Sequence, residues 1–214
     1  DVVDAARGVA ARLGEEGIGS GGHVVIWSEN RPEWIWTLWG CLLKGVVFVP
    51  IDYRASADFL LHVATIVDAK AIIIGETVGK LDTGVPVWSV RTVSRATAGR
   101  TELPEATPDS VAEVIFTSGA TSEPKGVVLT HRNILANIIP IEREVAKYRH
   151  YARPFRPIRF LNLLPLSHMF GQAMATFVPP MLPGTVVFTR SLAPEDIASQ
   201  IRTRRISILV CVPK

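Results

Sequence analysis

The sequence predicts an α/β fold in which layered, mostly parallel β-sheets are flanked by helices. First, strand-like and helix-like segments alternate along the whole chain of 214 residues, as in parallel sheets covered by helices. Second, apolar residues in the helix-like segments recur at spacings of three and four, which marks one face of a helix. Third, 48% of the residues are hydrophobic and 20% are charged, which is typical of a globular chain.

The first half of the chain alternates regularly between the two kinds of segment. Glycines between Gly17 and Gly22 end the first helix, and Asn30 is expected to cap the second, with Pro32 in its first turn. The expected helices are 2–13, 32–43 and 57–67, and the expected strands are 23–27, 46–49, 71–74 and 86–90.

In the second half, residues 91–110 are rich in Thr, Ser, Arg, Pro and Gly and are expected to form a surface connection, the best candidate for a link between subdomains. Pro140 is expected to kink the helix in which it lies. The expected strands are 111–117, 159–164, 185–189 and 206–212, and the expected helices are 134–148 and 194–204.

Charge and cysteine content exclude several classes of protein. The net charge of +3 and the absence of a long Lys or Arg run argue against a nucleic-acid partner. Cys41 and Cys211 are the only cysteines, both in apolar surroundings, so we expect two buried free thiols and a cytoplasmic setting. The longest apolar stretch, 34–51, contains Lys44 and Pro50, so no integral membrane segment is expected.

The most informative segment follows the expected strand 111–117. There, small and hydroxyl-bearing residues lead into Pro124, Lys125 and Gly126. Small residues allow backbone N–H groups to converge on phosphate oxygens, and a lysine adds a mobile positive charge. Because Lys125 precedes Gly126 rather than following it, the segment is not the P-loop of kinases and GTPases.

This loop resembles that of the adenylate-forming superfamily, which contains acyl-CoA synthetases, firefly luciferases and peptide-synthetase adenylation domains. The family loop reads approximately [YF]-T-S-G-[ST]-T-G-x-P-K-G-V, and residues 116–127 match it at most positions. Two further blocks, 164–171 and 43–52, match in the family's order. Ala120 departs from the usual Ser or Thr, and Ser122 departs from the usual Gly.

The resemblance implies that a carboxylate attacks the α-phosphorus of ATP to give an acyl-adenylate, and that a thiol, usually of CoA, then displaces AMP. It implies a phosphate site with Thr117 as a ligand of Mg²⁺, and a site for the acyl group and α-phosphate at His168, with Phe170 and Gly171 shaping the acyl entrance. The implied nucleotide-binding residues are Thr117, Ser118, Gly119, Ala120, Thr121, Ser122, Glu123, Pro124, Lys125 and Gly126. His131 and Arg132 are expected to open a helix capped by Thr130 rather than to contact ligand.

The run 163–172 resembles the fatty-acyl branch, so a medium- or long-chain fatty acid is the first expected substrate. An acyl substrate leaves peripheral association with a membrane open. Family members are much longer, so the chain is expected to be a partial N-terminal domain, unable to form a thioester alone. Three alternatives stay open: an acyl carrier protein ligase, an adenylation domain for another carboxylate, and a non-catalytic homologue that binds nucleotide or acyl groups.

Overall fold

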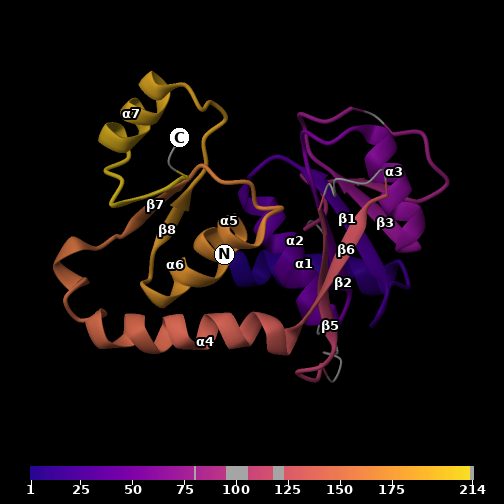
Figure 1. The fold of residues 1–214 in the computed structure, drawn as a ribbon, viewed down its shortest axis with the longest axis horizontal. Helices are drawn as coiled ribbons and strands as arrows, with labels where there is room; N and C mark the ends of the chain where they lie inside the picture. Colours follow the sequence, from indigo (N-terminus) through magenta and orange to yellow (C-terminus); the bar gives the residue numbers. More distant parts are fainter. Residues whose placement is uncertain (80, 95–105, 118–122, 213–214) are drawn as a thin grey trace. The chain divides into compact units, whose positions relative to one another are not determined.

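The computed structural model describes residues 1–79, 81–94, 106–117 and 123–212. The chain forms two compact units, Asp1–Asn133 and Ile134–Lys214 (Figure 1). Residues 91–94 and 106–110 of the expected connection belong to the first unit. Residues 95–105 lie outside the described residues.

The first unit is built on a six-stranded sheet of order β4-β3-β1-β2-β5-β6, in which only the pair β5–β6 is antiparallel. This confirms the prediction of a mostly parallel sheet. Its strands are β1 (His23–Ser28), β2 (Val47–Asp52), β3 (Ala69–Ile74), β4 (Val87–Ser89), β5 (Val111–Thr117) and β6 (Lys125–Thr130). Its helices are α1 (Val2–Glu15), α2 (Pro32–Lys44) and α3 (Ala57–Ile66).

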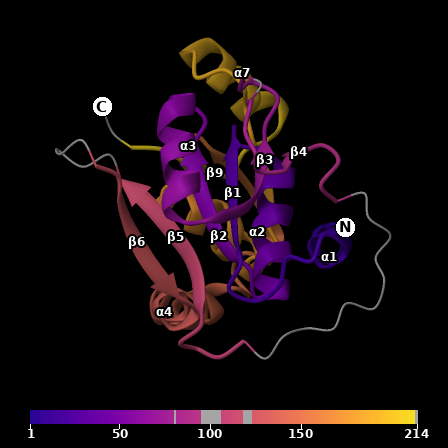
Figure 2. The ribbon, with the colours of Figure 1, turned by 90° about the vertical axis from the view of Figure 1, so that its right-hand side faces the viewer.

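Helices cover this sheet on both faces because successive residues of each strand point to opposite sides. In β2, Val47 and Val49 belong to the core that includes Leu60 and Val63 of α3. Phe48 lies between them in sequence and contacts Trp34 of α2, with ring centroids 4.9 Å apart. Figure 2 shows α3 on one side of β1 and β2 and α2 on the other.

α1 packs against α2 at a very close approach. A Cβ atom added to Gly40 would lie 2.5 Å from Cβ of Val9 and 2.9 Å from the carbonyl oxygen of Ala6. Only glycine therefore fits this helix crossing, because a side chain here would collide with a backbone rather than with a flexible tip.

The second unit contains a parallel three-stranded sheet of order β8-β7-β9. Its strands are β7 (Arg159–Asn162), β8 (Thr185–Val187) and β9 (Ile208–Val210). Its other elements are α4 (His131–Tyr148), whose first three residues belong to the first unit, η1 (Arg153–Phe155), α5 (Met169–Gln172), the π-helical turn η2 (Ala173–Phe177), α6 (Val178–Met181) and α7 (Pro194–Thr203).

Several local predictions are wrong or incomplete. Arg31, not Asn30, occupies the N-cap of α2, without a side-chain cap bond. Pro140 lies inside α4, as expected, and the kink expected there stays a prediction. β6 and the helical turns between Met169 and Met181 were not expected. Cys41 is buried as expected, but Cys211 is exposed, because it follows the short strand β9 instead of lying within a longer one.

Among the described residues, no helix is both long enough and apolar enough to cross a membrane.

Candidate functional site

The candidate phosphate loop is the connection of a β-hairpin. β5 and β6 pair in antiparallel fashion, and Thr117 opposite Lys125 is the last pair before the connection. Lys125 is therefore the first residue of a strand, with an exposed side chain. Residues Ser118, Gly119, Ala120, Thr121 and Ser122 lie outside the described residues, so their expected contacts with phosphate stay predictions.

Gly126 is closely covered by side chains of β5. It pairs with Phe116, and a Cβ atom at Gly126 would lie 3.0 Å from both the Phe116 ring and a methyl group of Val114. A larger residue here would require the ring or the methyl group to shift by a few tenths of an ångström. The Gly of the Pro-Lys-Gly motif therefore has a packing role next to Lys125.

The hairpin connection lies at the carboxyl edge of the parallel strands. β5 runs parallel to β2, β2 to β1, and β1 to β3, so the carboxyl ends of all four lie at one edge. In open α/β sheets this edge is where ligands bind. The structure therefore places the base of the predicted phosphate loop where a nucleotide site is expected, and β6 starts at this edge and runs away from it.

Glu123 makes a contact that the sequence did not predict. Its carboxylate lies 3.6 Å from Nε2 of His62 on α3, with the two side chains 74% and 47% exposed. A carboxylate next to a phosphate site would repel the nucleotide. The contact joins this carboxylate to α3, and no local sequence signal connects two residues so far apart in the chain.

The far end of the hairpin is fixed to α4 by reciprocal capping bonds. Thr130 Oγ1 accepts from the N–H of Asn133 at 3.2 Å, and the Thr130 N–H donates to Asn133 Oδ1 at 2.9 Å. This confirms that Thr130 caps the helix. His131 and Arg132 lie in the first turn of α4 as predicted, and burial lowers the pKa of His131.

Arg132 adds an ion pair to this junction. It donates two hydrogen bonds of 2.8 Å to Asp109, and these bonds lower the pKa of the Asp109 carboxyl. Both partners belong to the first unit, so the pair joins the start of α4 to the segment that precedes β5.

A second group of ion pairs lies in the loops that follow β1 and β3. These loops lie at the carboxyl edge of the sheet, the edge at which β5 ends. Arg31 donates to Glu33 through both Nε and Nη2 at 2.9 Å, and to Glu29 through Nη1 at 2.9 Å. The carboxylate of Glu29 also accepts from the Thr77 hydroxyl at 3.0 Å. Arg91 pairs with Glu76, which lies 3.6 Å from Arg31.

These contacts shift the pKa values of the carboxyls. The hydrogen bond from Arg31 is the main cause that lowers the pKa of Glu33. Burial works to raise the pKa of Glu29, but hydrogen bonds from its own backbone, Thr77 and Arg31 together hold it below its usual value. The cluster thus connects the β1–α2 loop to the loop after β3.

The second unit carries the predicted acyl-site residues. His168 is exposed and occupies the N-cap of α5, and Phe170 is 60% exposed. Gly171 is buried, and a Cβ atom there would lie 2.3 Å from the carbonyl oxygen of Pro165. Gly171 therefore allows the tight turn that presents His168 and Phe170 on one short helix, but a direct part in shaping an acyl entrance stays a prediction.

Buried polar residues lie beneath this turn, and no pattern in the sequence indicated them. Asn162, at the end of β7, donates to the carbonyl oxygens of Leu164 at 3.1 Å and Gly171 at 3.4 Å. The hydroxyls of Ser167 and Thr176 are buried and form no hydrogen bond within the described part of the chain. The π-helical turn that contains Thr176 is a geometry common at functional sites, which only the backbone reveals.

The described residues suit a magnesium ion only if the nucleotide supplies most of its ligands. No group of three or more His, Cys, Asp or Glu side chains among them is arranged to hold a metal. Mg²⁺ usually keeps several waters and binds through substrate phosphates, so it does not require such a group. Thr117 ends β5 opposite Lys125, and its expected role as a ligand of Mg²⁺ stays a prediction.

Solved structures share this fold over nearly the whole chain. The chain is similar to o-succinylbenzoate CoA synthetase from Bacillus subtilis in complex with an acyl-adenylate intermediate, with a TM-score of 0.81, 22% identity, and coverage of 98% of this chain and 42% of that chain. It is also similar to the N-terminal subdomain of NpsA from Klebsiella oxytoca, with a TM-score of 0.77, 20% identity, and coverage of 98% and 53%.

The names of the curated relatives include different carboxylic acids. A feruloyl-CoA synthase from Amycolatopsis is 27% identical over 96% of this chain and 41% of its own length. An L-proline ligase acting on a prolyl-carrier protein from Pseudomonas fluorescens is 28% identical over 97% of this chain and 43% of its own length. The chain thus spans about two fifths of these relatives. The model of the family described as AMP-binding enzyme matches residues 1–214, and the chain belongs to that family.

Proposed function

We propose that the chain is the ATP-binding N-terminal part of a ligase that activates a carboxylic acid as its acyl-adenylate and passes the acyl group to the thiol of CoA. The observation that carries this proposal is the hairpin in which Thr117 pairs with Lys125 at the carboxyl edge of the sheet. That geometry holds the family loop at its base and leaves the Lys125 side chain exposed for an anionic ligand.

In this proposal, Lys125 binds the β- and γ-phosphates through a charge-assisted hydrogen bond, and the backbone N–H groups of residues 118–122 complete the cradle. Thr117 would contribute one hydroxyl ligand to Mg²⁺, and the ion would supply positive charge beside the phosphates. His168, at the N-cap of α5, is proposed to hydrogen-bond the substrate carboxylate, with Phe170 beside it. These residues position the reactants and stabilise charge.

A medium- or long-chain fatty acid is the proposed acid, supported by the resemblance of residues 163–172 to the fatty-acyl branch. An acyl carrier protein in place of CoA is a second candidate, because a carrier-protein ligase is among the relatives. Pyrophosphate exchange by the full-length protein, measured with a panel of acids, tests the acid. If pyrophosphate exchange occurred with aromatic acids or amino acids but not with fatty acids, the fatty acid would be excluded as the substrate.

Calorimetric titration of the full-length protein with ATP tests the phosphate site. Lys125→Ala is expected to weaken ATP binding by about 10- to 150-fold, because a hydrogen bond to a charged group contributes about 1.5–3 kcal/mol. Lys70→Ala is the matched control, since Lys70 is exposed near the start of β3, at the opposite edge of the sheet. Unchanged ATP affinity in Lys125→Ala would exclude the assigned role, and a wild-type protein that binds ATP but shows no exchange would favour a non-catalytic homologue.

A further inference from the structure

The second unit carries a segment of unusual charge. Between Glu144 and Glu195 the sequence contains no acidic residue. The chain as a whole has a net charge of only +3, so its positive charge is concentrated here rather than spread evenly. The Lys and Arg residues of this acid-free stretch are Lys147, Arg149, Arg153, Arg156, Arg159 and Arg190.

Exposed aromatic rings interrupt these cations. Tyr148 is 58% exposed, Tyr151 67% and Phe155 72%. The rings of His150 and Tyr151 lie against each other with centroids 3.7 Å apart. Three such rings within residues 148–155 make this segment a candidate interaction site, because large exposed apolar patches mark such sites.

Arg149, His150 and Arg156, which neighbour these rings in the sequence, are also exposed. We call the six residues Tyr148, Arg149, His150, Tyr151, Phe155 and Arg156 the basic aromatic surface. In Figure 1 it includes the end of α4 and part of the chain that leads to β7. Glu144 is the nearest acid in sequence, and its carboxylate is paired with Lys147 at 2.6 Å.

A second basic segment of the same unit, at the end of α7, contacts the start of β7. Arg159, at the start of β7, donates to the carbonyl oxygen of Arg204 at 3.0 Å, just beyond the end of α7. Arg202, Arg204 and Arg205 are exposed there. The acids of α7, Glu195 and Asp196, lie in its first turn, at the other end of the helix.

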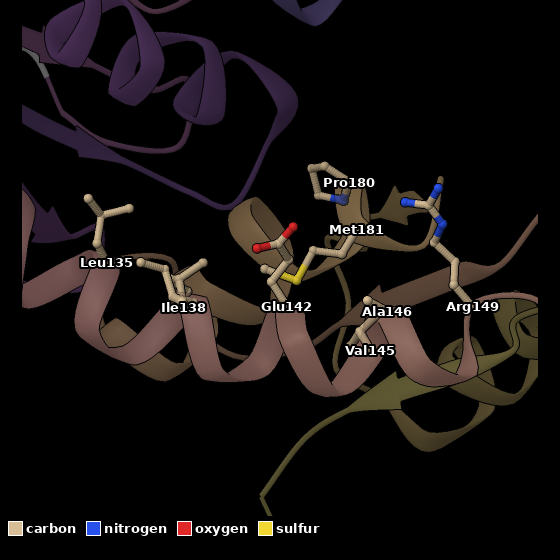
Figure 3. Close-up of a pocket in the computed structure, with 9 residues that line it drawn as sticks. Leu135, Ile138, Glu142, Val145, Ala146, Arg149, Pro180 and Met181 are labelled. Carbon is tan, nitrogen blue, oxygen red and sulfur yellow. The ribbon is translucent and has the colours of Figure 1, made fainter.

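An apolar groove extends from the basic aromatic surface along α4. It lies between α4 and α6, has a volume of about 400 Å³, and is lined by Leu135, Ile138, Val145 and Met181 among others. Figure 3 shows Arg149 at one end of the labelled row and Leu135 at the other, with Glu142 between them. The groove therefore combines an apolar floor with a cation at one end, which suits an amphiphile.

We propose that the basic aromatic surface binds the anionic surface of a lipid bilayer. Arginines next to anionic headgroups are attracted electrostatically, and tyrosine and phenylalanine rings bury their apolar parts at the boundary between headgroups and acyl chains. Because one weak signal gives only marginal membrane binding, charge and aromatic insertion must act together. The surface provides both, and the groove accepts part of an acyl chain.

A single-stranded nucleic acid also binds cations and aromatic rings. The groove and Phe155 favour the bilayer, because a nucleic acid has phosphates and bases but no acyl chain for an apolar groove. Proposed catalytic residues are absent from the basic aromatic surface, so membrane binding and adenylation are separable in experiments.

Flotation of the full-length protein with lipid vesicles tests whether the basic aromatic surface binds an anionic bilayer. Vesicles of phosphatidylcholine with 30% phosphatidylserine are expected to bind the protein, and vesicles of phosphatidylcholine alone are not. The double variant R149E/R156E is expected to bind about 25-fold more weakly or worse, because each cation near an anionic surface contributes roughly fivefold. Y151S/F155S, which keeps the charge, is also expected to weaken binding.

The control R7E/K70E makes the same change in net charge with two exposed residues of the first unit, and it is expected to bind like the wild type. Near-ultraviolet circular dichroism identifies any variant that fails to fold, and Y151S/F155S then serves as the second test. Absence of wild-type binding to the anionic vesicles, or equal losses in R7E/K70E, would overturn the proposal. So would binding to a single-stranded oligonucleotide, with the same sensitivity to R149E/R156E, by a protein that ignores the vesicles.

Discussion

His62 on α3 lies 3.6 Å from the carboxylate of Glu123, the residue immediately before Pro124 and Lys125. The contact is largely exposed, so it adds little to stability, on the order of 0.2–1 kcal/mol. Its importance lies in its position, because it involves a carboxylate two residues before Lys125, next to the proposed site of the ATP phosphates.

Removal of His62 is therefore expected to weaken ATP binding. His62→Ala frees the Glu123 carboxylate to approach the phosphates, and we expect an affinity loss of about 1.4- to 5-fold, the equivalent of 0.2–1 kcal/mol. Glu123→Gln is expected to strengthen ATP binding slightly. Calorimetric titration of both variants and of the double variant measures the coupling. If His62→Ala weakened binding equally in the Glu123→Gln background, the effect would not pass through Glu123.

The close approach of α1 and α2 leads to a stability prediction. Gly40→Ala places a Cβ atom where Val9 and the carbonyl oxygen of Ala6 already lie, so one helix must move. Overpacking of this kind costs typically 1–3 kcal/mol. We expect a matching decrease in the free energy of unfolding, measured by urea denaturation.

Gly19→Ala is the control for this substitution. A Cβ atom at Gly19 has no neighbour within 4 Å, and Gly19 does not have a positive φ. We expect this variant to unfold close to the wild type. A Gly40→Ala protein that is as stable as Gly19→Ala would show that the helices separate at no cost.

The elements of the fold were predictable from local patterns in the sequence, whereas the site required long-range pairing. The alternation of apolar segments predicted β1 to β5 and the helices between them, because each is an apolar run or stripe of its own. β6 was missed because residues 125–130 read as the end of a loop motif. Its strand conformation depends on β5, which supplies its hydrogen-bonding partner.

The motif did not indicate how its residues are arranged. Lys125 was expected within a loop, and it is instead the first residue of a strand opposite Thr117. The contact of Glu123 with His62 joins residues from different elements, and no periodicity of sequence encodes such a contact. The position of Asn162 beneath the His168 turn was missed for the same reason.

The two cysteines are expected to react very differently with a thiol reagent. Cys41 is fully buried in α2, and burial raises the pKa of its thiol far above the usual value, so little reactive thiolate forms. Cys211 is exposed. In the native full-length protein, Cys211→Ser should remove one rapidly reacting thiol, measured with a chromogenic disulfide. Cys41→Ser should remove a thiol that reacts only after unfolding. Rapid loss of the Cys41 signal without denaturant would contradict the buried packing of α2.

The cluster of Arg31 with Glu29 and Glu33 is expected to make stability depend on pH in the acidic range. Both carboxyls have lowered pKa values in the folded protein. Their contribution is therefore complete above the usual carboxyl pKa of 4.5, and it is lost as the pH falls through the lower folded values.

Arg31→Met removes the cation from both carboxylates. Near pH 7 we expect the free energy of unfolding to fall by about 1.5–3 kcal/mol, the usual contribution of a hydrogen bond to a charged group. Below pH 4.5 the difference from the wild type should shrink, because protonated carboxyls no longer need the cation. Urea denaturation between pH 3 and pH 7 measures the difference, and Arg7→Met, at an exposed arginine of α1, is the control. A difference that stayed constant over this range would mean that Arg31 acts through packing alone.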